Sequence, residues 1–264
     1  CKITVYENAK DLGGKFPLDR GMFGGKKLIV FGDSITDGEG CDRDRNYFAK
    51  LCQYLGSTSD PTDTCNINLA LGGSTVTYPG GVVRASTTEL FTDPRGERDP
   101  YPNILDADLC VIYYGTNDFS VNAYSKAPEG SNKTDNPTKA EDAVTVKGAF
   151  NFMVDTMRTL NPDLKFLLLP PLFRGDYEYW ESIKHNFVYN DEGTDVQNLT
   201  TKEYLSDFAT AIEEVAMEKG ARFVNWFGIF TKRTFTKYSI YSDDGCHPNE
   251  SAHKVMFEYL ISQF

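Results

Sequence analysis

Residues 28–38 read LIVFGDSITDG, an apolar run followed at once by a Gly-Asp-Ser turn. A short apolar run bounded by glycines is typical of a β-strand that is buried on both faces. Open α/β sheets carry their functional groups at the carboxyl edge of such strands. The stretch therefore predicts that the Ser34 hydroxyl lies at the carboxyl edge of a parallel sheet.

The rest of the chain repeats this strand character, with intervals that suit helical crossovers rather than hairpins. The predicted strands are Lys27–Phe31, Asn66–Leu71, Leu109–Tyr114, Lys165–Leu169 and Arg222–Asn225. Helical spacing of apolar residues predicts helices over Asn46–Leu55, over Ala140–Leu160, from a capping box at Thr200–Glu203 to Gly220, and after Pro248-Asn249. Segments 77–102 and 120–139 lack periodicity and are predicted to be irregular. We expect residues 1–25 to form an N-terminal arm or linker and residues 26–264 to form one domain.

Composition excludes several classes of function. The chain has 264 residues, a net charge of −11 and a pI of about 4.8, so it repels phosphate backbones and is not expected to bind nucleic acid. No apolar run is long enough to span a bilayer. The six cysteines form no C-x-x-C pair, so neither a zinc site nor a redox motif is expected, while disulfides among Cys41, Cys52 and Cys65 stay open. The chain begins at Cys1 without an initiator methionine, which suggests a processed or excised chain.

A serine nucleophile needs an adjacent base, and one segment near the C-terminus offers one. His247 stands in a predicted loop three residues after Asp244, a spacing that lets the carboxylate meet one ring nitrogen while the other points outward. The other two histidines are weaker candidates: His253 suits a packing or surface role, and His185 lies in a polar aromatic stretch. Taken alone, Asp244 and His247 fit equally well a polar loop that caps the last helix.

Acyl transfer also needs donors for the oxyanion that forms during the reaction. Asn117, in the stretch Gly115-Thr116-Asn117-Asp118 after the third strand, offers a side-chain amide, and the backbone N–H of Ser34 lies close to the reacting carbon. A third donor is expected from the turn after the second strand, which contains Gly72 and Gly73. Ordinary turn chemistry explains both segments as well. Asp33 and Asp37 are expected to cap a helix rather than to bind metal.

These segments together resemble the SGNH hydrolases, also called GDSL esterases or lipases. Gly32-Asp33-Ser34 resembles the first block of that family, residues 68–75 the second, Gly115–Asp118 the third, and Asp244–His247 the last. The resemblance runs from Lys26 to the C-terminus. It implies a flavodoxin-like three-layer α/β/α sandwich with a mostly parallel five-stranded sheet.

The resemblance also implies roles for individual residues. Ser34 would be the nucleophile, His247 and Asp244 its base and orienting acid, and Ser34, Gly73 and Asn117 the oxyanion donors. Gly73 aligns better than Gly72, and the usual Ser-Gly of this block is Gly-Gly here. No metal or cofactor is expected.

We therefore expect a serine esterase acting on a short-chain ester of a small molecule or glycan, with O-acetyl groups on carbohydrate preferred. Aromatic residues in the loops offer faces for sugar rings, although core packing explains them nearly as well; they are Tyr78, Tyr101, Phe119, Tyr124, Tyr177, Tyr179 and Trp180. A lysophospholipase or thioesterase is the alternative within the family. An inactive glycan-binding module of a larger surface or phage protein is the alternative outside it, but the complete set of site residues argues against it. The compartment is left open among secreted, cell-surface and phage-particle locations.

Overall fold

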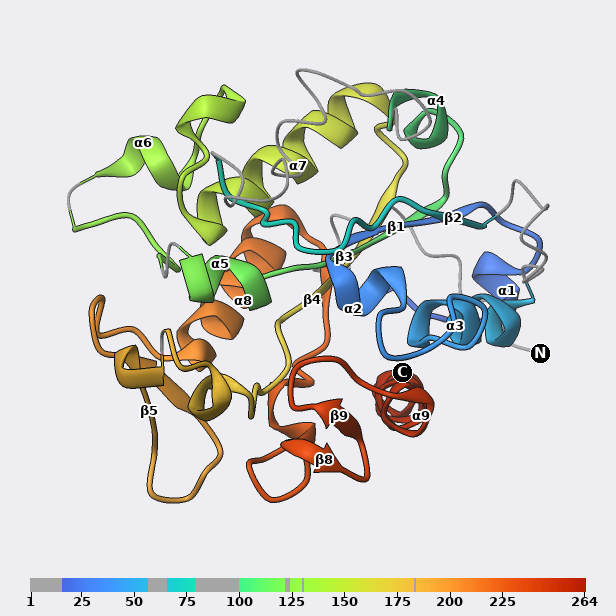
Figure 1. Ribbon diagram of the computed structural model, residues 1–264. Helices are drawn as coiled ribbons and strands as arrows, with labels where there is room; N and C mark the ends of the chain where they lie inside the picture. The colour runs from blue at the N-terminus through green and yellow to red at the C-terminus, as the bar shows by residue number, and fades with distance from the viewer. Residues whose placement is uncertain (1–15, 57–65, 79–99, 122–123, 130, 183) are drawn as a thin grey trace.

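The computed structural model describes residues 16–56, 66–78, 100–121, 124–129, 131–182 and 184–264. Its centre is a five-stranded sheet in which every pairing is parallel (Figure 1). The strands run in the order β2 (Asn66–Asn68), β1 (Leu28–Gly32), β3 (Leu109–Tyr113), β4 (Lys165–Leu169) and β7 (Arg222–Phe223). All five predicted strands are confirmed, and the sheet is the flavodoxin-like one that the resemblance implied.

The strand order reverses next to β1, because the chain places β2 on one side of it and β3 on the other. Ligands of open α/β sheets bind at such a reversal, beyond the carboxyl ends of the strands. Ser34 follows β1 directly, and Asn117 lies in α5 (Thr116–Val121), shortly after β3. The topology therefore brings two predicted site residues to the reversal point.

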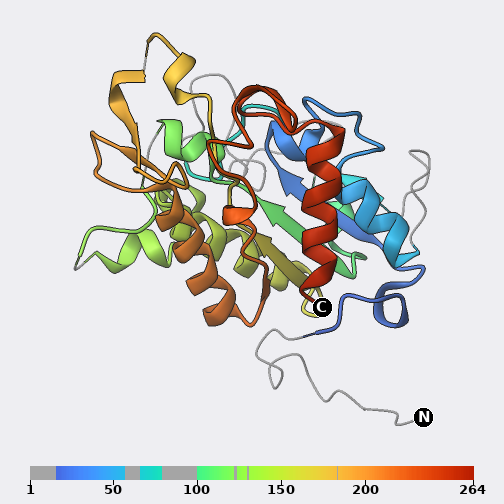
Figure 2. The same ribbon diagram turned by 90° about the horizontal axis from the view of Figure 1, so that it is seen from below.

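Helices cover both faces of the sheet (Figure 2). Helices α3 (Tyr47–Leu55) and α9 (Glu250–Ser262) pack together on one face, whereas α7 (Val146–Leu160) and α8 (Leu205–Lys219) pack together on the other. Alternate strand residues serve the two layers: Val30 joins the core under α3 and α9, and Ile29 joins the core under α7 and α8. The predicted three-layer sandwich is confirmed.

Two predicted helix starts are wrong, and tertiary contacts explain one of them. The capping box at Thr200–Glu203 does not form, because the Glu203 carboxylate accepts hydrogen bonds from Ser125 N and Oγ, at 2.8 and 2.9 Å. Helix α8 begins instead at Leu205, where the Asp207 carboxylate accepts from Tyr204 N at 2.7 Å. Helix α7 begins at Val146 rather than Ala140, capped by the Thr145 hydroxyl.

Part of the segment before β1 packs on the domain. Phe16, Leu18 and Phe23 are buried in the core that contains α3, and residues Arg20–Phe23 form the short helix α1. Residues 1–15 lie outside the described residues, so the domain boundary at residue 25 stays a prediction. Segment 120–139 is less irregular than expected, since it contains the end of α5 and the helix α6 (Asn132–Asp135), whereas residues 79–99 of the other long loop lie outside the described residues.

Shorter elements complete the fold. They are α2 (Ser34–Asp37), α4 (Tyr101–Ile104), the 3-10 helices η3 (Ala140–Asp142), η4 (Tyr177–Tyr179), η5 (Lys184–Asn186) and η6 (Phe227–Ile229), and the two-stranded pairs β5 (Phe187–Tyr189) with β6 (Val196–Asn198) and β8 (Lys237–Ser239) with β9 (Ser242–Asp244). Cys41, Cys52, Cys110 and Cys246 are free thiols, and Cys1 and Cys65 lie outside the described residues. Within the described ranges, no helix has the length and apolar character needed to cross a membrane.

Candidate active site

Ser34 is the first residue of α2 and follows β1 after a single intervening residue. That residue, Asp33, caps the helix as expected, with its Oδ1 accepting from Ile35 N at 3.0 Å. The amides of Asn46 and Asn68 both donate to the Thr36 carbonyl, at 3.0 and 2.8 Å. Two other elements therefore hold α2 in place, and the Ser34 side chain is held with it.

Asp244 ends β9 and His247 lies in the loop between β9 and α9, and both approach Ser34. His247 Nε2 lies 2.9 Å from Ser34 Oγ, and His247 Nδ1 lies 2.6 Å from Asp244 Oδ2. Asp244 Oδ1 accepts the backbone N–H groups of Cys246 and His247, both at 2.8 Å. The three side chains that the sequence predicted thus form one continuous chain of hydrogen bonds, although 213 positions separate Ser34 from His247.

The pKa shifts of His247 and Asp244 match a base held beside an ionised acid. Burial works to lower the pKa of His247, but its hydrogen bond to Asp244 and the charges of Asp244 and Glu39 outweigh that effect, so the pKa is raised. Burial works to raise the pKa of Asp244, and the hydrogen bonds from the His247 side chain and from the backbone lower it instead. Asp244 is therefore ionised at neutral pH, where it stabilises an imidazolium.

Asp33, directly before Ser34, differs from Asp244 in that its pKa is raised. It is fully buried, and burial raises its pKa to about 7 despite its hydrogen bond from Ile35 N. Its Oδ2 is buried and has no hydrogen-bond partner among the described residues. A proton on this oxygen removes the cost of a buried charge.

The predicted oxyanion segments lie against each other. Asn117 Nδ2 donates to the Ser74 carbonyl at 2.8 Å, which ties the Asn117 amide to the turn after β2. Gly73 in this turn has φ +75°, a conformation that glycine adopts freely. The Gly72 N–H already donates to Asp37 Oδ2 at 3.2 Å, so of these two glycines it is Gly73 whose N–H stays available as a donor.

Two sets of contacts that fasten the segments around Ser34 were missed in the sequence. The buried Asp118 carboxylate accepts from Val76 N, Thr77 N and Thr77 Oγ1, at 3.2, 3.0 and 2.7 Å, and so fastens the turn after β2 to α5. Its signal was its place in the same block as Asn117.

The second set centres on a buried ion pair in the loop after β4. Arg174 and Asp176 are 2% and 1% exposed and form a two-pronged pair, with N···O distances of 2.8 and 2.5 Å. Arg174 Nη1 also donates to the Thr116 carbonyl at 3.3 Å and to Ser120 Oγ at 3.0 Å. Arg174 thereby links this loop to the start of α5, beside Asn117. A charge that follows an apolar strand and two prolines is the only sequence signal for it.

The remaining candidates divide between core and surface. His253 is fully buried, and its Nδ1 accepts from Tyr47 N at 3.2 Å, so the packing role is confirmed. Phe119 and Tyr177 are fully buried, and the interpretation of these two as sugar-binding faces is wrong. Tyr124, Tyr179 and Trp180 are 52%, 43% and 45% exposed.

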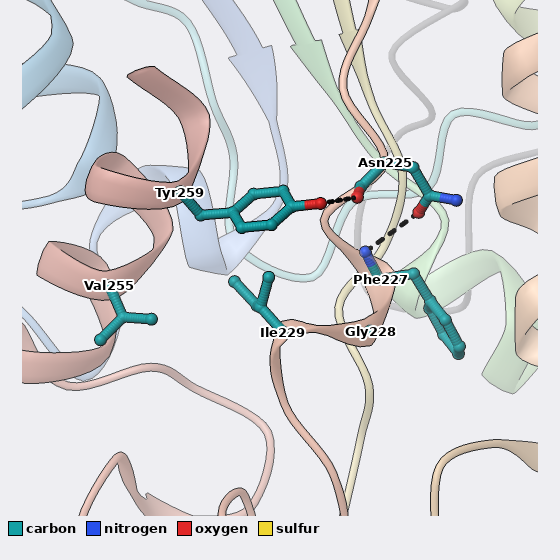
Figure 3. Close-up of a pocket in the computed structure, with 6 residues that line it drawn as sticks. All are labelled: Asn225, Phe227, Gly228, Ile229, Val255 and Tyr259. Atoms are coloured by element: carbon teal, nitrogen blue, oxygen red, sulfur yellow. Dashed lines mark hydrogen bonds between the residues drawn. The ribbon is translucent and has the colours of Figure 1, made fainter. Parts of the chain in front are cut away.

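A separate apolar pocket of about 790 Å³ lies between α9 and the loop after β7 (Figure 3). Val255 and Tyr259 line it from α9, and Asn225 and residues 227–229 line it from the loop. The Tyr259 hydroxyl closes one side by donating to the Asn225 carbonyl at 2.9 Å. None of the predicted site residues lines this pocket. Among the described residues, no group of three His, Cys, Asp or Glu side chains is placed to hold a metal ion.

The profile of the GDSL-like lipase/acylhydrolase family matches residues 30–255. A protein from Lactobacillus plantarum has a similar fold, with a TM-score of 0.64, 19% identity, and coverage of 91% of this chain and 97% of that one. A possible lipase from Chitinophaga pinensis gives a TM-score of 0.55 at 17% identity, covering 90% and 97% of the two chains. The acetylxylan esterase Axe2 from Geobacillus stearothermophilus gives 0.52 at 17% identity, covering 92% and 95%.

These structural similarities show a shared fold, and a comparison with curated proteins finds no significant match. A parallel α/β/α sandwich with a serine and a histidine facing each other at the strand reversal defines the class as a hydrolase of the serine type. The family match then makes the assignment specific. The chain belongs to the GDSL-like lipase/acylhydrolase family, whose members act on ester bonds, and the resemblance noted in the sequence is confirmed.

Proposed function

We propose that Ser34, His247 and Asp244 form a catalytic triad that hydrolyses short-chain carboxylic esters, with O-acetylated carbohydrate as the preferred substrate. The observation that carries this proposal is the unbroken chain of hydrogen bonds from Ser34 Oγ through the imidazole to Asp244, with distances of 2.9 and 2.6 Å. A base must stand within hydrogen-bond reach of the proton that it takes, and His247 Nε2 does.

In the first half of the reaction, Ser34 Oγ attacks the ester carbonyl carbon while His247 Nε2 takes the hydroxyl proton. The tetrahedral intermediate collapses as the same nitrogen gives that proton to the alcohol oxygen, which leaves. In the second half, His247 takes a proton from water as the water oxygen attacks the acyl-serine. The second tetrahedral intermediate collapses as His247 gives that proton to Ser34 Oγ, and the acid leaves. Asp244 fixes the tautomer and stabilises the imidazolium in both halves.

The oxyanion of each intermediate would be held by Ser34 N, Gly73 N and the Asn117 amide. Ser34 N belongs to the first turn of α2, where backbone N–H groups have no acceptor within the helix. Asn117 Nδ2 carries two hydrogens, so one is available after the other is donated to the Ser74 carbonyl. Preorganised donors of this kind contribute the largest single part of the rate enhancement in acyl transfer.

A carbohydrate alcohol is favoured by exposed aromatic side chains close to the loop that carries His247. The Tyr179 hydroxyl lies 3.1 Å from Thr236 Oγ1, next to β8, and the Trp180 ring lies over Arg174, with 5.2 Å between the ring centroid and the guanidinium carbon. Flat aromatic faces of this kind suit sugar rings. The similar fold of Axe2, described as an acetylxylan esterase, supports the same substrate class.

The test is hydrolysis of p-nitrophenyl acetate and p-nitrophenyl octanoate by the wild type and by Ser34→Ala. We expect turnover that favours acetate and falls by about 10⁴-fold or more in Ser34→Ala, while the circular dichroism spectrum stays unchanged. Equal activity in Ser34→Ala would refute the mechanism. A preference for octanoate would shift the substrate class toward lipids or thioesters, and folded protein without activity would favour a binding module.

A further inference from the structure

The loop after α2 brings a second carboxylate to the mouth of the site. Glu39 Oε2 lies 3.5 Å from His247 Nε2, the same nitrogen that faces Ser34 Oγ. This carboxylate oxygen also lies 3.8 Å from the position that a Cβ on Gly72 would occupy, and Ser34 Cβ lies 3.6 Å from that position. Glu39 therefore lies beside His247 and the turn after β2, close to Ser34.

The backbone around Glu39 is fixed against the site. The N–H groups of Gly38 and Glu39 both donate to the Ser34 carbonyl, at 3.0 and 2.9 Å. Gly40 has φ +86°, and a Cβ there would lie 2.9 Å from the Pro248 carbonyl oxygen and 3.1 Å from His247 Cβ. Because the loop packs so closely on His247, the fold holds the backbone of Glu39 beside the imidazole.

Unlike its neighbour Asp37, Glu39 retains free hydrogen-bond acceptors. Asp37 is engaged by Arg43 and by the Gly72 N–H. The Glu39 side chain is 63% exposed, and within the described part of the chain its ion-pair contact is with His247 alone. A carboxylate accepts several hydrogen bonds, so Glu39 has acceptor sites left for a substrate hydroxyl.

The reaction determines which part of a substrate meets Glu39. In the proposed mechanism, His247 Nε2 gives its proton to the oxygen of the leaving alcohol, so that oxygen must lie beside Nε2. A hydroxyl on the next carbon of the alcohol is then close to Glu39, because Glu39 Oε2 lies 3.5 Å from that nitrogen. A negatively charged group on the alcohol would lie close to the Glu39 carboxylate, and repulsion between the two negative charges disfavours such a substrate.

We propose that Glu39 selects the alcohol half of the ester, by accepting a hydrogen bond from a hydroxyl next to the ester oxygen and by disfavouring anionic alcohols. This inference rests on the proposed esterase function. It narrows the substrate class to acetate esters of neutral polyols, which include sugars that keep a free neighbouring hydroxyl.

Three small acetate esters test it, with acetate release as the common measurement. Glycerol 1-monoacetate has the neighbouring hydroxyl, propyl acetate lacks it, and 3-acetoxypropanoate carries a negative charge. We expect the wild type to prefer them in that order by kcat/KM. In Glu39→Ala, the preference for glycerol monoacetate over propyl acetate should fall about tenfold, as loss of a hydrogen bond to a charged group does. The rate with 3-acetoxypropanoate should rise relative to propyl acetate in both Glu39→Ala and Glu39→Gln.

A pH profile adds a readout that a purely structural residue would not change. The charged and titratable groups around the His247 imidazole are Asp244, Glu39, Asp33 and Arg174. Of these, Glu39 raises the pKa of His247, so Glu39→Gln should move the acid limb of kcat/KM for propyl acetate to lower pH. The matched control is Glu258→Gln, because Glu258 is an exposed residue of α9 that pairs with Lys254. This variant should keep the wild-type preferences among the three esters and the wild-type acid limb of the pH profile.

The outcomes separate this inference from the function on which it rests. Unchanged ester ratios in Glu39→Ala, or an unmoved acid limb in Glu39→Gln, would overturn the role of Glu39 while leaving the esterase intact. Activity that survives Ser34→Ala, or the absence of hydrolysis of all three esters by folded wild type, would overturn both.

Discussion

His247 and His253 lie six residues apart in the chain, and the fold gives them opposite properties. The His247 side chain is 19% exposed in the loop before α9, with the Asp244 carboxylate on one ring nitrogen. His253 lies one turn inside α9 and is fully buried, stacked on Tyr47 with its Nδ1 accepting from Tyr47 N. One histidine has an acidic partner, whereas the other has only the core.

The two environments move the two pKa values in opposite directions. Burial lowers the pKa of His253 to about 3, with a smaller contribution from the charge of Lys50. Burial acts on His247 in the same sense, but the Asp244 hydrogen bond and nearby negative charges reverse it. A carboxylate in direct contact thus decides whether a histidine near the core can carry a proton at neutral pH.

The largest expected effect comes from removing the imidazole that has the acidic partner. His247→Ala should lower kcat/KM for p-nitrophenyl acetate by about 10⁴–10⁶, because the variant has no group to take the Ser34 proton. The free energy of unfolding should change by no more than about 1 kcal/mol, since the lost contact with Asp244 is partly exposed. Steady-state kinetics and urea titration at pH 7 measure the two quantities. A rate within tenfold of the wild type would show that another base serves Ser34.

The next effect concerns the Asn117 amide, the proposed oxyanion donor in α5. Asn117→Ala should lower kcat by about 10²–10³, as loss of one oxyanion donor does. KM should change little, because the donor acts mainly on the charge that develops in the transition state. Asn136→Ala, which alters an exposed amide outside the site, serves as a control for expression and folding. A large rise in KM with unchanged kcat would assign Asn117 to substrate binding instead.

The third effect is on stability rather than on rate, and it belongs to His253. Because its pKa is about 3 when folded and near its ordinary value of 6.5 when unfolded, the unfolded state binds more protons between these values. The stability that neutral His253 confers is therefore complete above pH 6.5 and is lost as the pH falls, by about 1.4 kcal/mol per pH unit. Urea titrations between pH 7 and pH 4 should show a shallower decline for His253→Gln than for the wild type. His185→Gln, at an exposed position, should follow the wild type.

Most of the fold could be predicted because it depends on local patterns. The five strands are short apolar runs, and the period of the apolar residues located the four long helices. The helix starts were harder to predict. A capping box is a local signal, and at Glu203 a long-range contact with Ser125 used the same carboxylate. The site could be predicted because its residues fall in four short blocks, and each block lies beside a strand end or a helix start. The blocks are residues 32–34, 68–75, 115–118 and 244–247.

The order of residues along the chain was enough to predict that a serine, an asparagine and a histidine–aspartate pair follow separate elements. Because parallel strands share one carboxyl edge, the serine and the asparagine were expected to meet there. Only the tertiary structure decided which neighbours complete the site. Glu39 faces His247 because its loop packs on Pro248, and Arg174 reaches α5 because β3 and β4 are adjacent in the sheet. Such contacts join residues whose separation along the chain has no period, so a pattern in the sequence does not reveal them. The environment that makes one histidine basic and its neighbour inert is likewise set by burial and contact, which exist only once the chain has folded.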